Sequence, residues 1–173
     1  LPKTNALDRL MWMNAAEVAF LRAEGALRGW NMGAEAKELY NSAIALSFEQ
    51  YGVSDKAADY IANTELKPAA YTDPRSAFND TGGPRSQITI AGEDEGGLER
   101  NLERIITQKW IAIFPLCVEA WSEFRRTGYP KLIPVVENKS GGTIDSNIMP
   151  RRLWYPPIEY SENSANISSA VTN

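Results

Sequence analysis

Residues 104–130, RIITQKWIAIFPLCVEAWSEFRRTGYP, have the densest apolar pattern of this 173-residue chain. Large apolar residues recur at helical spacing until Pro115, where a helix must break. Those residues, two of which precede the stretch, are Leu98, Leu102, Ile105, Ile106, Trp110 and Ile113. A second short helix is predicted beyond Pro115, and its apolar stripe consists of Val118, Trp121 and Phe124. We therefore expect two core helices joined at a proline and packed around large aromatic side chains.

The end of this stretch combines two cations with residues that stop a helix. Arg125 and Arg126 are favourable near a helix C-terminus. Gly128 suits the left-handed turn beyond a helix, and Pro130 prevents the helix from continuing. The motif could also bind an anion, but a helix end accounts for it more simply. We assign a core role to the tryptophans and a structural one to the tyrosine of this set: Trp110, Trp121, Trp154 and Tyr129.

Two more helices are predicted upstream, over residues 9–28 and 34–51. Thr4 or Asn5 can cap the first helix, and Gly52 ends the second. The apolar faces consist of Met13, Ala16, Phe20, Ala23 and Leu27 in the first helix and of Tyr40, Ile44, Phe48 and Tyr51 in the second. The pattern predicts an antiparallel hairpin with small alanines where the helices approach closely.

The hairpin contains a charge pair, and its turn carries an aromatic residue. Glu24 and Arg28 stand four positions apart, so they can form an ion pair. The turn at residues 29–33 carries Trp30. Alanine-rich hairpins of this length resemble a tetratricopeptide unit, but about three such units are needed for a stable stack. We therefore expect the hairpin to dock on the helices of residues 104–130 or on repeats upstream of the chain.

An irregular region separates the hairpin from the central helices. A short helix is predicted over residues 54–62, and after it prolines and glycines interrupt the pattern to residue 97. Residues 87–90 could form a short strand. A loop of this length is usually functional or disordered, and this one carries Tyr71 and Phe78.

The end of the chain turns apolar again. Leu153, Trp154 and Ile158 are too large and apolar to remain in water, so we expect this tail to pack back on the helices. Arg152 is expected to pair with an acid such as Glu159.

Composition narrows the possible functions. The net charge is −4 without a long basic block, which argues against nucleic acid as a partner. The chain has no histidine and therefore lacks the commonest general base and zinc ligand. Its single cysteine, Cys117, lies in an apolar helical context and is interpreted as a buried, inert thiol. The chain has no run of 18 apolar residues, so the sequence predicts no membrane-spanning helix.

Several motifs in this order resemble the SusD/RagB family. The central motifs are Gln108-Lys109-Trp110, Phe114-Pro115, Glu119-Ala120-Trp121 and Arg125-Arg126-Thr127-Gly128-Tyr129-Pro130. The tail motif is Pro150-Arg151-Arg152-Leu153-Trp154-Tyr155-Pro156, followed by Glu159-Tyr160-Ser161 and Asn163. The opening Ala15-Ala16-Glu17-Val18, continued by Phe20-Leu21-Arg22-Ala23-Glu24, resembles the family's helical-repeat segment.

The resemblance implies a fold and an organisation. The fold would be mainly α, with tetratricopeptide-like helical hairpins and long irregular loops. The chain would be a single domain from the C-terminal portion of a SusD-like protein. Within it we expect a helical hairpin region at residues 1–62, an irregular loop at 63–97, and helices with a packed tail at 98–173.

The resemblance also implies a function. Members of this family are surface lipoproteins of Bacteroidetes that bind a glycan or another nutrient at the outer membrane. The captured ligand would pass to a SusC-like TonB-dependent transporter, with neither catalysis nor a cofactor. The lipid anchor would lie outside this fragment.

Loop position indicates the candidate ligand residues, because binding side chains are often held on loops by a rigid scaffold. On this basis we predict Tyr71, Phe78 and Trp30 as ligand-binding residues, and no catalytic or metal-ligating residue. Two alternatives remain open. The hairpin could belong to a helical-repeat protein–protein interaction module, or the paired acids Glu119 and Glu123 could serve a carboxylate-dependent glycoside hydrolase.

Overall fold

Helices dominate the part of the chain that the computed structural model describes. That part comprises residues 11–68, 86–91, 96–132, 138–145, 150 and 152–171. The elements are α1 (Ala15–Leu27), α2 (Ala36–Gln50), the 3-10 turn η1 (Ser54–Lys56), α3 (Ala57–Ile61), α4 (Gly97–Ala112), α5 (Cys117–Thr127), α6 (Pro157–Glu162) and α7 (Ser164–Val171). Within these ranges no strand occurs, and the predicted mainly-α fold is confirmed.

The chain divides into two compact units. Unit 1 is Leu1–Ile133 and contains α1 to α5, and unit 2 is Pro134–Asn173 and contains α6 and α7. The expected organisation as a single domain in three regions stays a prediction.

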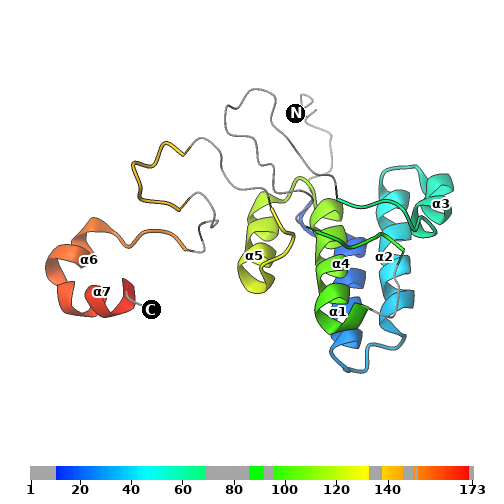
Figure 1. Cartoon of the computed structure of the whole chain (residues 1–173), viewed down its shortest axis with the longest axis horizontal. Coiled ribbons are helices and arrows are strands. Elements are labelled where there is room, and N and C mark those ends of the chain that lie inside the picture. Colours follow the sequence, from blue (N-terminus) through cyan, green and yellow to red (C-terminus); the bar gives the residue numbers. More distant parts are fainter. Residues whose placement is uncertain are drawn as a thin grey trace. The chain divides into compact units, whose positions relative to one another are not determined.

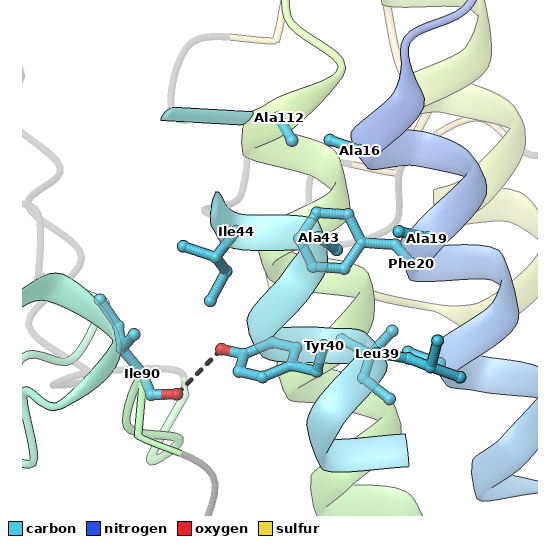
Figure 2. Close-up of a cluster of buried hydrophobic side chains, with 11 residues drawn as sticks. Ala16, Ala19, Phe20, Leu39, Tyr40, Ala43, Ile44, Ile90 and Ala112 are labelled. Atoms are coloured by element: carbon cyan, nitrogen blue, oxygen red, sulfur yellow. Dashed lines mark hydrogen bonds between the residues drawn. The ribbon is translucent and has the colours of Figure 1, made fainter. Parts of the chain in front are cut away.

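The core of unit 1 lies between α1, α2 and α4, which stand side by side (Figure 1). Ala16, Ala19 and Ala23 of α1 and Ala43 of α2 are buried, so small side chains let the helices approach closely. Larger side chains then fill the space between them, as Figure 2 shows for Phe20, Leu39, Tyr40 and Ile44. The predicted antiparallel hairpin is therefore confirmed as α1 and α2.

Asn14 fixes the start of α1. Its side-chain oxygen accepts a hydrogen bond from the backbone N–H of Glu17 at 2.6 Å, which is an N-cap. Its amide nitrogen donates to the carbonyl of Ala112 at 3.0 Å, at the end of α4. The predicted start at residue 9 with Thr4 or Asn5 as cap is wrong, because Asn14 supplies the cap and residues 11–13 are not helical.

The directions of the three core helices follow from two contacts. Asn14 places the start of α1 at the end of α4, so α1 and α4 are antiparallel. The Tyr51 hydroxyl, just after α2, donates to the carbonyl of Phe114, just after α4, at 2.9 Å. The ends of α2 and α4 therefore lie together with the start of α1. The opposite end of the bundle contains the end of α1 and the starts of α2 and α4.

Residues 86–91 are irregular, so the predicted strand at 87–90 is wrong. Ile88 and Ile90 are buried, as the alternation implied. The carbonyl groups of Ile90 and Thr89, however, accept hydrogen bonds from side chains instead of from a neighbouring strand. The Tyr40 hydroxyl donates to Ile90 at 2.9 Å (Figure 2), and the Arg104 Nε donates to Thr89 at 2.8 Å.

The central helices α4 and α5 occur as predicted, but their buried faces differ in part from the expected ones. On α4, the buried members of the predicted stripe are Leu102, Ile105 and Ile106, with Ile113 just after the helix. Leu98 and Trp110 are not buried, and Val118 of α5 is exposed. Cys117 is exposed as well, so its interpretation as a buried thiol is wrong. The residue of α5 that is buried is Glu123, because α5 contacts the bundle through charge.

The predicted end of α5 is confirmed. Gly128 has φ of 77°, in the left-handed region, and its N–H donates to the carbonyl of Phe124 at 2.8 Å. Arg125 lies over the ring of Trp121 at 4.5 Å. The Tyr129 hydroxyl hydrogen-bonds Glu99 of α4 at 3.1 Å, which agrees with a structural role.

Unit 2 contains a small helical pair. α6 and α7 contact each other, and Ile167 of α7 is buried. The guanidinium of Arg152 lies 4.6 Å from the ring centre of Tyr155, a different partner from the expected Glu159. Leu153 and Trp154 are exposed in the structure, whereas a core role was expected for Trp154. The packing of this tail on the helices of unit 1 stays a prediction.

Candidate functional site

A buried lysine connects α1, α4 and α5. The side chain of Lys109, on α4, is 1% exposed. Its ammonium nitrogen lies 3.0 Å from Glu123 and 3.7 Å from each of Glu17 and Glu119. A buried ammonium is costly unless it is paired. Carboxylates from α1 and α5 therefore compensate a charge that α4 carries into the interior.

A second cation joins the same group of acids. Arg126 of α5 makes a two-pronged contact with Glu24 of α1, with both N–O distances at 2.6 Å. It also lies 2.8 Å from Glu123, so Glu123 is shared by both cations. Arg28 contacts Glu24 at 2.9 Å, which confirms the predicted pair. We call Glu17, Glu24, Lys109, Glu123 and Arg126 the ion cluster.

Burial and pairing shift two carboxyl groups of the ion cluster in opposite directions. Burial raises the pKa of Glu17, and the charge of Lys109 only partly opposes this rise. Burial would also raise the pKa of Glu24, but hydrogen bonds from Arg126 and Arg28 and their charges outweigh it. The pKa of Glu24 is therefore lowered.

The ion cluster does not fit the chemistry of a glycoside hydrolase. Such an enzyme places two carboxyl groups on either side of a sugar in an open cleft. Here the acids considered for that role, Glu119 and Glu123, both face the same ammonium of Lys109. Glu123 is buried, which keeps it from a polymeric substrate. We interpret the ion cluster as the element that holds α5 on the bundle.

A surface hollow of about 440 Å³ lies at the end of the bundle where α1 ends and α2 begins. We call it the α1–α2–α4 hollow. Its lining includes Leu27, Glu35, Lys37, Glu38, Tyr40, Asn101 and Arg104. A hollow of this size is within the range of small-molecule sites.

Two buried side chains give the hollow a fixed wall. Tyr40 and Arg104 are both held by the irregular segment at residues 86–91 through the hydrogen bonds described above. Burial raises the pKa of the Tyr40 hydroxyl, which therefore stays neutral. Arg104 also hydrogen-bonds Asn101. The carboxylates of Glu35 and Glu38 add acceptors, so the hollow suits a ligand rich in hydroxyl groups.

Trp30 lies in the turn between α1 and α2, and its side chain is 62% exposed. Leu27 and Glu35, on either side of this turn, line the hollow. Backbone contacts hold the turn: the Trp30 N–H donates to Gly25 at 2.9 Å, and Arg22 donates to the carbonyl of Met32 at 2.6 Å. The position predicted from the sequence is therefore an exposed aromatic on a fixed turn.

The other predicted ligand residues, Tyr71 and Phe78, lie outside the residues that the structure describes. Sequence reasoning missed the polar residues of the hollow. Asn101 and Arg104 have the sequence pattern of an ordinary helix surface. No local signal distinguishes them, because the hollow forms only where three helix ends converge.

The described residues were also considered for a metal site and for a membrane-spanning helix, and they form neither. They contain no group of three or more cysteine or carboxylate residues that could hold a metal ion. None of the helices in these ranges is both long and apolar enough to cross a membrane.

The fold and the hollow define a helical scaffold that presents a polar surface site. The sequence profile of the SusD-like family, described as SusD and RagB outer membrane lipoprotein, matches residues 2–173. The chain therefore belongs to the SusD-like family, and the resemblance stated from its motifs is confirmed.

Solved structures support the same assignment. A chitin-binding SusD homologue from Flavobacterium johnsoniae is 51% identical, with a TM-score of 0.77 over 92% of this chain and 33% of its own. A SusD homologue from Bacteroides thetaiotaomicron is 51% identical, with a TM-score of 0.80 over 98% of this chain and 35% of its own. One from Bacteroides uniformis is 44% identical, with a TM-score of 0.82 over 99% of this chain and 35% of its own. The chain thus spans about a third of the length of these relatives. No curated protein matches it.

Replacement of the buried lysine should destabilise the protein. In the Lys109→Met variant of the full-length protein, Glu17 and Glu123 lose their shared ammonium in a buried position. We expect the free energy of unfolding to fall by about 3–5 kcal/mol, as for other broken buried pairs. Denaturant unfolding measures the change, and the exposed Lys56→Met is the matched control. Adding Glu17→Gln to Lys109→Met should restore part of the loss, and a further loss would contradict this role for the lysine.

Loss of Glu24 should alter the pH dependence of stability. Because its folded pKa lies below its ordinary value of 4.5, the carboxylate stabilises the fold above that pH and loses this effect as pH falls through the folded pKa. We expect Glu24→Gln to lower the free energy of unfolding by about 1–3 kcal/mol at pH 7, since half-exposed Arg126 can turn to water. The difference from the unmodified protein should shrink below pH 4.5 in acid titrations of stability. A difference that grows on acidification would refute the assignment, and the exposed Glu49→Gln serves as control.

Proposed function

We propose that the full-length protein binds a glycan at the surface of the outer membrane and leaves it chemically unchanged. The observation that supports this most is the 51% identity to a chitin-binding SusD homologue over 92% of this chain. Family membership supports the membrane location, since the family is one of outer membrane lipoproteins. We further propose a chitin-type glycan as the first ligand class to test.

The proposed ligand site within this chain is the α1–α2–α4 hollow together with the neighbouring turn that carries Trp30. An exposed indole such as that of Trp30 offers a flat apolar face for the C–H surface of a sugar ring. Asn101, Glu35 and Glu38 offer hydrogen-bond partners for hydroxyl and acetamido groups. Tyr71 and Phe78 remain proposed ligand residues on the basis of their loop position in the sequence.

The absence of catalysis is part of the proposal. Glu119 and Glu123, the acids considered for hydrolysis, both face Lys109. An acid that donates a proton to a glycosidic oxygen needs a raised pKa and contact with the substrate. The burial of Glu123 argues against such contact.

Binding of chitin oligosaccharides by the full-length protein tests the proposal, with calorimetry as the measurement. We expect Trp30→Ala to weaken the affinity about tenfold, the effect of losing roughly 1.4 kcal/mol of contact energy. Trp154→Ala is the matched control, because Trp154 is exposed to a similar extent, 66%. The control variant should bind as the unmodified protein does.

Other outcomes separate the alternatives. Release of soluble sugars that is lost in Glu119→Gln would replace the binding proposal with hydrolysis. If the full-length protein binds none of a broad set of glycans but binds a peptide strongly, the result would favour a helical-repeat interaction module. Chitin binding that is equal in Trp30→Ala and Trp154→Ala would move the site away from the α1–α2–α4 hollow.

We also propose delivery of the ligand to a SusC-like TonB-dependent transporter. Membership of the SusD-like family supports this proposal. Copurification of the full-length protein with such a transporter from outer membranes should recover a stable complex. Recovery of the full-length protein alone under mild detergent conditions would contradict this partner.

A further inference from the structure

The turn after α1 is a Schellman motif with one unusual feature. Gly29 has φ of 83°, in the left-handed region, and its N–H donates to the carbonyl of Ala26 at 2.9 Å. The Trp30 N–H donates to the carbonyl of Gly25, also at 2.9 Å. In such a motif, the residue at the position of Trp30 usually packs an apolar side chain on the third or fourth residue from the helix end. Here those two residues are Gly25 and Glu24, so neither offers the indole an apolar side chain.

Met32 fills the space over Gly25 instead of the indole. A β-carbon at position 25 would lie 2.9 Å from Cγ and 3.0 Å from Sδ of Met32, so this side chain lies directly against the backbone of Gly25. Met32 is partly buried and packs on the core of unit 1, whereas Trp30 is 62% exposed. The turn thus buries the smaller apolar side chain and leaves the larger one in solvent, the reverse of what apolar burial alone favours.

Polar contacts hold Met32 in this place. The guanidinium of Arg22, on α1, donates to the carbonyl of Met32 at 2.6 Å. The N–H of Gly33 donates to the side chain of Asn31 at 3.2 Å, and Gly33 has φ of 85°. The turn is therefore tied to α1 on both sides of the indole, by the N–H of Trp30 and by Arg22.

We propose that Met32 is a positioning residue, which keeps the indole of Trp30 in solvent for the ring of a sugar. This inference rests on the ligand site proposed above. An indole that already stands in solvent on a fixed turn loses little conformational freedom when a sugar ring stacks on it, so more of the contact energy appears as affinity. Without the side chain of Met32, the indole could be buried over Gly25, and this burial would compete with the ligand.

The Met32→Ala variant of the full-length protein tests this role. In protein labelled with fluorotryptophan, the fluorine NMR resonance of Trp30 is identified by its loss in Trp30→Phe. We expect Met32→Ala to shift this resonance and to reduce its response to exchange of light for heavy water, because the indole moves over Gly25. The affinity for a chitin oligosaccharide should fall about fivefold in calorimetry. Met32→Leu, which fills the same space, should restore both the resonance and the affinity.

The matched control is Met13→Ala, because Met13 precedes α1 and is 58% exposed. This variant should change neither the Trp30 resonance nor the affinity. An unchanged resonance in Met32→Ala would overturn the proposal at any affinity, because the indole would not have moved. A shifted resonance with full affinity, beside weaker binding in Trp30→Ala, would refute the positioning role alone. If Trp30→Ala also binds with full affinity, the proposed ligand site is wrong and the positioning role is refuted with it.

Discussion

The arrangement of unit 1 depends on the buried ammonium of Lys109. An ammonium in the interior is stable only if several carboxylates are delivered to it from fixed positions. Glu17 of α1 and Glu123 of α5 meet this need, and Glu24, two turns beyond Glu17 on the same face of α1, holds Arg126. The apolar stripe of α5 is largely not buried, so charge pairing more than apolar burial fixes this helix against α1.

This origin of the packing explains which parts of the fold were predictable. Local signals gave the hairpin, the pairing of Glu24 with Arg28 and the turn at Gly128, because each depends on residues within one or two helical turns. The burial of Glu123 and the exposure of Val118 were missed. The usual rule that an apolar stripe faces the core applies to a whole protein. This chain is only about a third of the length of its relatives.

The candidate site was predictable in a similar, partial way. Trp30 could be inferred because an aromatic residue in a glycine-rich turn has no helix face to join. The hollow beside this turn could not be inferred, because Glu35 and Asn101 become neighbours only through the antiparallel packing of α1 and α2 and the docking of α4. Contacts between residues so distant in sequence leave no local period to detect.

The two ends of the bundle differ in chemistry, and this difference supports different roles. The hollow end is lined by Glu35, Lys37 and Glu38, whose charged groups would be costly to bury under an apolar partner. At the opposite end Trp12, Phe114 and Val118 are exposed, and the described segments 11–14, 50–53 and 110–118 contain no charged residue. Trp30 and the charged residues of the hollow lie at the end of the bundle for which we propose the ligand site.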